Sequence, residues 1–167
     1  MLLTACAGGT KRSELDRNAA DIAFARDMIA HHEQAVEMSD LVGADASAEV
    51  MALARQIEAA QGPEIDRMNG WLDDWDAEEM DDEMSHDTGH GSMPGMMSRA
   101  DLEALEQASG ETFDRSWLTM MIAHHEGAVE MARTEIADGK NAEAIALAED
   151  IVSSQSDEIT TMKELLR

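Results

Sequence analysis

Cysteine is almost absent from this chain of 167 residues, which contains one, Cys6. A single cysteine can form neither an intrachain disulfide framework nor a thiolate metal cage. Proline and aromatic residues are also scarce, at two prolines and 3% aromatic residues. Few helix breakers and a hydrophobic content rich in Ala, Leu and Met favour helices, since these side chains lose little rotamer freedom there. The sequence therefore predicts an all-α protein.

Basic residues are few as well, with 12 Lys and Arg against 36 Asp and Glu, which gives a formal net charge of -24. Such a charge repels nucleic acid and anionic lipid, so nucleic acid is excluded as a partner. The charge either keeps the protein soluble or draws cations to its surface, and the sequence leaves both open. No apolar run approaches the roughly 20 residues that span a bilayer.

The lone cysteine follows Leu3-Thr4-Ala5, which resembles a bacterial lipobox, where the cysteine is lipidated. Little of a signal peptide precedes it, and a cysteine without a function is the alternative. Residues 1–16 are read as a lipobox remnant and flexible tether. We therefore expect an extracytoplasmic protein, lipid-anchored to the membrane surface or secreted, that meets the membrane only through an anchor at Cys6.

An internal repeat organises the rest of the chain. Residues 28–38 read MIAHHEQAVEM and residues 121–131 read MIAHHEGAVEM, which differ at one position. A second motif, Gln-x-x-Glu-Ile-x-x-Met, follows each copy. Two helical hairpins that arose by duplication bury their apolar faces most simply as a four-helix bundle. We predict one bundle domain over residues 17–167, with helix-length segments at 17–42, 47–75, 112–137 and 141–166, grouped as repeat 1 (17–75), a linker (76–111) and repeat 2 (112–167).

The linker is acidic and then rich in Gly, His and Met, without a helical period, so most of it is read as a loop. A short helix is expected at residues 99–108. Ser98 can serve as its N-cap, with Asp101 completing a capping box. Gly110 is expected to end this helix as its C′ residue.

A helical wheel places the paired histidines of both copies within the apolar arc. Glu33, Gln34 and Glu37 fall on the opposite side and are read as a solvated face. A single histidine on an apolar stripe is commonly a satisfied core residue, but a pair repeated twice beside methionine favours metal ligation. The candidate ligands are His31, His32, His124 and His125, with Met28 and Met121 one turn away.

Other methionines and four polar residues complete the predicted site. Met38, Met131, Met68 and Met162 are candidate ligands whose alternative role is core packing. The second helix of each repeat turns polar residues toward the same interior. A buried polar group without a partner costs about 1–3 kcal/mol, so we expect these residues to serve the histidines or a bound ion, with Glu64 and Glu158 orienting the imidazoles through their second nitrogens. They are Gln61, Glu64, Gln155 and Glu158.

Ligand softness indicates copper. Di-iron bundles carry Glu-x-x-His on their inward faces, whereas these helices carry Met-x-x-His. Thioether and imidazole together suit Cu(I), Cu(II) is possible, and zinc is less favoured because it gains little from methionine. The linker is either a solvated acidic loop or holds an auxiliary loop metal site. Its candidate ligands are His86, His90, Met84, Met93, Met96 and Met97.

At these motifs the sequence resembles the bacterial family called domain of unknown function 305. The resemblance rests on the duplicated Met-Ile-x-His-His-x-x-Ala-Val-x-Met, on the two Gln-x-x-Glu-Ile-x-x-Met motifs and on Met93-Pro94-Gly95-Met96-Met97, and it covers about residues 20–167. It implies an extracytoplasmic, ferritin-like four-helix fold. Some relatives bind copper and support copper tolerance, while likeness to ferritins does not import iron chemistry.

Three functions follow, of which the first is favoured. It is an extracytoplasmic copper-binding protein that sequesters copper or hands it to a copper-handling protein partner, contributing to copper tolerance. The second is a metal-dependent, oxidase-type bundle enzyme, although the sequence carries no nucleophile triad, phosphate loop or cofactor fingerprint. The third is a metal-free envelope interaction module with a buried histidine network. The oligomeric state, and whether the two halves form one shared site or two, stay open.

Overall fold

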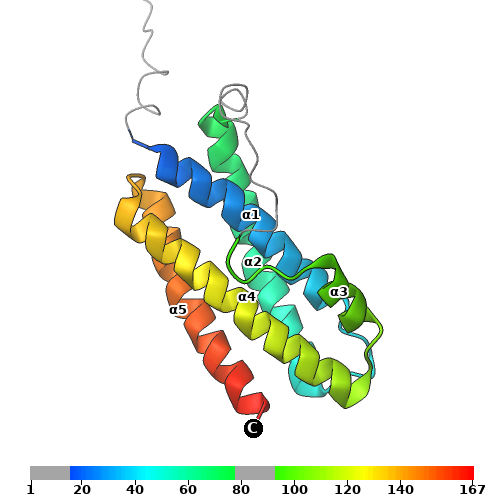
Figure 1. Cartoon of the computed structure of the whole chain (residues 1–167). Coiled ribbons are helices and arrows are strands. Elements are labelled where there is room, and N and C mark those ends of the chain that lie inside the picture. Colours follow the sequence, from blue (N-terminus) through cyan, green and yellow to red (C-terminus); the bar gives the residue numbers. More distant parts are fainter. Residues whose placement is uncertain (1–15, 78–92) are drawn as a thin grey trace, which may run out of the picture.

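The computed structural model describes residues 16–77 and 93–167 (Figure 1). Within these residues the chain forms five helices and no strand, which confirms the all-α prediction. None of these helices is long and apolar enough to cross a membrane. The helices are α1 (Ala19–Asp40), α2 (Ala48–Asp74), α3 (Arg99–Glu106), α4 (Gly110–Asp138) and α5 (Ala142–Leu165).

Polar side chains fix where most of the helices begin. Asn18, Ser47 and Asn141 accept hydrogen bonds from the first backbone N–H groups of α1, α2 and α5. These bonds satisfy donors that a helix N-terminus leaves free. Ser98 and Asp101 form the predicted capping box of α3.

The start of α4 differs from the sequence-based expectation. The short helix α3 ends at Glu106, and Gly110 does not terminate it. Gly110 is instead the first residue of α4, with a φ of 54°. Its backbone N–H donates to Asp45 Oδ2 at 3.1 Å, so a carboxylate from the α1–α2 turn takes over the role of the missing side-chain cap.

The helices pair as two hairpins, α1 with α2 and α4 with α5, and α1 lies along α4 between them (Figure 1). Two equivalent aspartates tie the hairpins together. Asp21 Oδ1 accepts from the backbone N–H groups of Lys140 at 2.8 Å and Asn141 at 2.7 Å. Asp114 Oδ2 accepts from the backbone N–H of Ser47 at 3.0 Å. An aspartate of α1 therefore binds the N-cap residue of α5, and an aspartate of α4 binds the N-cap residue of α2. This pairing requires α1 and α4 to run antiparallel.

The apolar core divides into two clusters along α1 and α4. One contains Phe24, Met28 and Met68 and the other contains Met38 and Met121. Because His31 stands between Met28 and Met38 on α1, the paired histidines lie between the two clusters. The core therefore has a polar middle layer enclosed by apolar side chains at both ends.

Candidate metal centre

The four motif histidines are buried in this middle layer, each no more than 1% exposed. His31 and His124 occupy equivalent positions of the two repeats and face each other across the contact between α1 and α4. Their ring centroids are 3.8 Å apart, with an interplanar angle of 38°. The centroid of His124 is 6.4 Å from that of its neighbour His125. Equivalent residues of the two repeats thus meet at the centre of the fold.

A carboxylate holds the outer histidine of each hairpin. His32 Nε2 lies 2.7 Å from Glu64 Oε2, and His125 Nε2 lies 2.9 Å from Glu158 Oε2. Glu158 also accepts from Gln56 Nε2 at 3.0 Å, which links α2 to α5. In a neutral imidazole such a bond places the proton on Nε2 and leaves the lone pair on Nδ1. Both Nδ1 atoms are buried and have no hydrogen-bond partner among the described residues.

The inner pair has no carboxylate partner. His31 Nε2 donates to the carbonyl oxygen of Pro94 at 3.0 Å, and its Nδ1 has no partner. Neither ring nitrogen of His124 has a partner among the described residues. Buried polar atoms are normally paired, so two adjacent imidazoles with unpaired nitrogens require an explanation.

Burial also keeps the inner pair uncharged. Desolvation is the largest cause that lowers the pKa of His31 to about 4, and it holds the pKa of His124 well below the ordinary value of 6.5. The charge of a neighbouring histidine acts in the same direction at both rings. Because neutral imidazole is the form that binds metal, both rings are ready to ligate at neutral pH.

Thioethers stand on both sides of the histidine layer. Met28 and Met68 are fully buried in one core cluster, with half-buried Met131 packed against it. The other cluster contains Met38, Met121 and Met162, all fully buried. The equivalent residues Met28 and Met121 therefore lie at opposite ends of the layer, as antiparallel helices require.

Imidazole and carboxylate groups alone do not form a metal cage here. In the parts of the chain that the structure describes, no group of three or more His, Cys, Asp or Glu side chains could hold an ion. Gln61 and Gln155 are buried, and their Oε1 atoms have no hydrogen-bond partner among the described residues. The donors present around this centre are imidazole nitrogens and, in the clusters on either side, thioether sulfurs, a set that suits a soft metal.

The structure describes only some of the residues of the predicted auxiliary site. His86, His90 and Met84 lie outside the described residues, as does Cys6. Met93, Met96 and Met97 are described and half-buried, in the segment that leads to α3.

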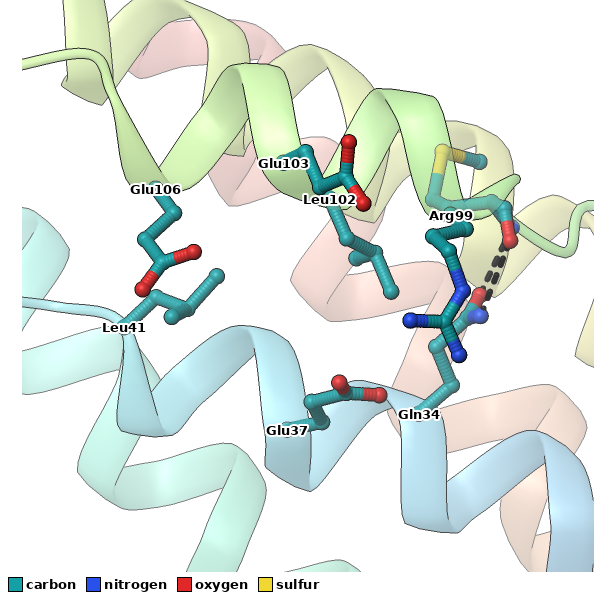
Figure 2. Close-up of a pocket in the computed structure, with 8 residues that line it drawn as sticks. Gln34, Glu37, Leu41, Arg99, Leu102, Glu103 and Glu106 are labelled. Atoms are coloured by element: carbon teal, nitrogen blue, oxygen red, sulfur yellow. Dashed lines mark hydrogen bonds between the residues drawn. The ribbon is translucent and has the colours of Figure 1, made fainter.

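Sequence reasoning placed one residue of this region wrongly. Gln34 was expected on the solvated face with Glu33 and Glu37, but it is 9% exposed. The segment before α3 covers it. Gln34 Nε2 donates to the carbonyl oxygen of Met97 at 3.0 Å, and Gln34 Oε1 accepts from the backbone N–H of Met97 at 2.6 Å (Figure 2). The available signal was the repeat itself, because position 34 is the one that differs between the two copies.

Fold and site together define an all-α protein of two duplicated hairpins around a buried layer of histidine and methionine. The chain belongs to the DUF305 family, a domain of unknown function, whose model matches residues 21–166. No curated protein matches the chain.

Solved structures agree with this assignment. A DUF305 protein from Streptomyces coelicolor, predicted to be secreted, has 34% sequence identity and a TM-score of 0.77, over 88% of this chain and 91% of that one. A DUF305 fragment from Deinococcus radiodurans has 28% identity and a TM-score of 0.75, over 90% and 97%. CopM in its Cu(II)-bound form has 35% identity and a TM-score of 0.73, over 87% and 95%. CopM structures with Cu(I) and with silver are also similar to this chain.

Proposed function

We propose that this chain is an extracytoplasmic copper-binding protein that sequesters copper or hands it to a copper-handling protein partner, and so contributes to copper tolerance. The observation that carries the proposal is the buried pair His31 and His124. Their rings are adjacent, neutral and in possession of unpaired nitrogens. Such a pair destabilises a metal-free core, because each unpaired buried polar atom costs about 1–3 kcal/mol.

The proposed ligands are the histidines of this layer and the thioethers around it. Glu64 and Glu158 orient His32 and His125, and they favour the tautomer whose Nδ1 is free to bind. Gln61 and Gln155 lie close along the same helices, with oxygen atoms that remain unpaired. The ligand set is His31, His32, His124 and His125, with Met28, Met121, Met38, Met131, Met68 and Met162.

Copper is the proposed ion, chiefly as Cu(I). Sulfur and imidazole donors suit Cu(I), while the imidazoles also accept Cu(II), and zinc gains less from sulfur. The relative CopM has been solved in Cu(I)-bound, Cu(II)-bound and silver-bound forms, and it is similar to this chain over most of its length. Silver is a soft monovalent ion like Cu(I), so these complexes agree with a soft-metal site.

The remaining features fit capture of a cation outside the cytoplasm. A net charge of -24 concentrates cations near the surface. Methionine needs no deprotonation to bind copper and survives where thiols are oxidised. The same proposal includes three further features: a lipid anchor at Cys6, an auxiliary site in the His/Met-rich linker and a ferritin-like arrangement of the four long helices.

Cu(I) titration of the purified protein, in competition with a chromophoric chelator, tests this proposal. Replacing the four histidines of the layer with Ala should abolish binding at the centre. The matched control is Glu37→Gln with Glu130→Gln, which changes equivalent exposed residues of both repeats and should leave binding unchanged. If the histidine variant is folded and retains the full stoichiometry, the proposed centre is wrong. A milder variant, Met28→Leu with Met121→Leu, keeps the core volume and should weaken Cu(I) more than Cu(II).

The oxidase-type enzyme and the metal-free module predict different behaviour. An oxidase would oxidise Cu(I) or Fe(II) in excess over the protein, whereas a binding protein stops at its stoichiometry. A metal-free module would bind no copper in the same titration.

A further inference from the structure

The segment Met93–Met97, here called the strap, crosses the middle of the molecule between the linker and α3 (Figure 1). It is fastened on the α1 side by Gln34. The amide of this side chain both donates to and accepts from the backbone of Met97, at 3.0 and 2.6 Å. Figure 2 shows the pair of bonds at one end of the groove between α1 and α3. A primary amide can make this two-way bond, whereas a carboxylate can only accept.

On the α4 side the strap lies directly on the helix backbone. A Cβ atom at Gly127 would collide with the carbonyl group of Pro94. Gly95 has a φ of 78°, and a Cβ atom there would collide with the carbonyl oxygen of Ala123. Glycine at both positions is what allows two backbones to approach so closely.

This close approach brings the carbonyl oxygen of Pro94 to His31 Nε2, at 3.0 Å. Gln34 and Gly127 are equivalent positions of the two repeats, and they are the single difference between MIAHHEQAVEM and MIAHHEGAVEM. The bond therefore forms at one of two equivalent inner histidines. His124, on the other repeat, has no partner at either ring nitrogen among the described residues.

We propose that Gln34, Gly127 and the strap act together as a positioning device, which holds the proton of His31 on Nε2 and presents Nδ1 as the metal donor, whereas the equivalent His124 has no such device. The part of this inference that concerns metal donation by His31 Nδ1 rests on the proposed function. A backbone carbonyl here does for His31 what Glu64 and Glu158 do for the outer histidines, without placing a third carboxylate in the layer. The two equivalent inner histidines of the duplicated fold thereby differ, because a backbone carbonyl orients only His31.

The tautomer of His31 in the metal-free protein is the direct test. Long-range ¹H–¹⁵N correlation spectra of the labelled protein distinguish a protonated Nε2 from a protonated Nδ1, and a His31→Asn variant assigns the signals. We expect a single Nε2–H tautomer in the unaltered protein. Gly127→Ala should displace the Pro94 carbonyl and give a mixture of tautomers. The matched control is Gly70→Ala in α2, where a Cβ atom meets nothing within 4 Å, and it should leave the spectrum unchanged.

Gln34→Ala provides a second and milder variant, which removes the fastening without introducing a clash. It should also give a mixture of His31 tautomers. Gln34→Glu should recover the Nε2–H tautomer only in part, because a carboxylate cannot donate to the carbonyl oxygen of Met97. Loss of such an orienting partner weakens metal binding by about 10–100-fold, so we expect that weakening for Cu(I) at unchanged stoichiometry.

The two proposals fail in different ways. If Gly127→Ala and Gln34→Ala both fold and leave the His31 tautomer unchanged, the strap does not position His31 and the inference is wrong. If the tautomer shifts in both variants but the unaltered protein binds no copper, the positioning of the ring is supported and the copper function is overturned.

Discussion

The rings of His31 and His124 lie against each other across the contact between α1 and α4, tilted by 38° with their centroids 3.8 Å apart, although neither ring donates to the other. Each residue comes from the same position of its own repeat. The antiparallel pairing of α1 and α4 brings the two copies together at the centre of the fold. For the copper site proposed above, we therefore predict one central site that both repeats share rather than two separate sites.

A shared site makes a clear prediction for single substitutions. His31→Ala and His124→Ala should each lower the Cu(I) affinity by at least about tenfold, and the double variant should add little, because residues that act as a unit are not additive. Competition titrations of the three variants measure this. Independent sites would instead give two additive losses, each affecting half of the bound copper.

The two carboxylate–histidine pairs should tune affinity without setting stoichiometry. Glu64→Gln and Glu158→Gln keep an oxygen that can accept from Nε2 but lose the negative charge. Each should weaken Cu(I) binding by about 10-fold or more at constant stoichiometry, as measured by calorimetry. Glu37→Gln, on the exposed side of α1, is the control. An equal loss in that control would indicate a general effect of charge.

Glu135 should make the stability of the protein depend on pH. It is 1% exposed, and desolvation, followed by its contacts with Asp21 and the charge of Asp138, raises its pKa from 4.5 to about 8. Burial also acts to raise the pKa of Asp21, but backbone N–H groups of Asn141, Lys140 and Asn18 overcome it and hold that pKa below its ordinary value. The native protein therefore holds a proton on Glu135 beside an ionised Asp21.

The sign of the effect follows from linkage. Below pH 4.5 the folded and unfolded chains both protonate Glu135, and the contribution to stability is complete. As pH rises from 4.5 to about 8 the unfolded chain ionises while the folded chain does not, so this contribution is progressively lost.

The measurement is thermal unfolding of Glu135→Gln and of the unaltered protein across this range. Glu135→Gln should raise Tm by several degrees at pH 8.5 and should differ little at pH 4.5. Exposed Glu130→Gln is the control and should show no such trend. A constant difference between Glu135→Gln and the unaltered protein at every pH would contradict the account.

Copper should stabilise the folded chain. A ligand that binds only the native state at about 100 times its Kd adds about 2.7 kcal/mol, and such a change moves Tm by about 2–4 °C per kcal/mol in a protein of this size. Thermal melts with and without Cu(I), in reducing buffer, measure the shift. Replacing His31 and His124 with Ala should remove it. An unchanged Tm for the copper-loaded unaltered protein would favour a metal-free core.

Helical periodicity predicted the part of the site that depends on local structure. All four histidines of the layer are buried as the wheel indicates, and Glu64 and Glu158 reach His32 and His125 from the second helix of each hairpin. These placements follow from a spacing of 3.6 residues per turn and from the pairing of neighbouring helices. The all-α class followed in the same way from composition and pattern.

Contacts between distant segments were beyond such reasoning. Gln34 looks solvated on a wheel, and it is buried because residues far along the chain fold back over it. Gly110 looks like a helix end, and it opens α4 because Asp45, from another turn, supplies the cap. Glu135 lies on the buried stripe of α4, three residues after Ala132 and seven after Ala128, but the spacing does not reveal that Asp21 of α1 contacts it. The periodicity of one helix carries no information on what packs against it.

X-ray absorption at the copper edge of the Cu(I)-loaded protein reports directly which atoms bind the ion. We predict a first shell that contains both nitrogen and sulfur, and the loss of that mixed shell when His31 and His124 are replaced with Ala. A shell of oxygen and nitrogen without sulfur, or a mixed shell that survives in the folded double variant, would contradict it.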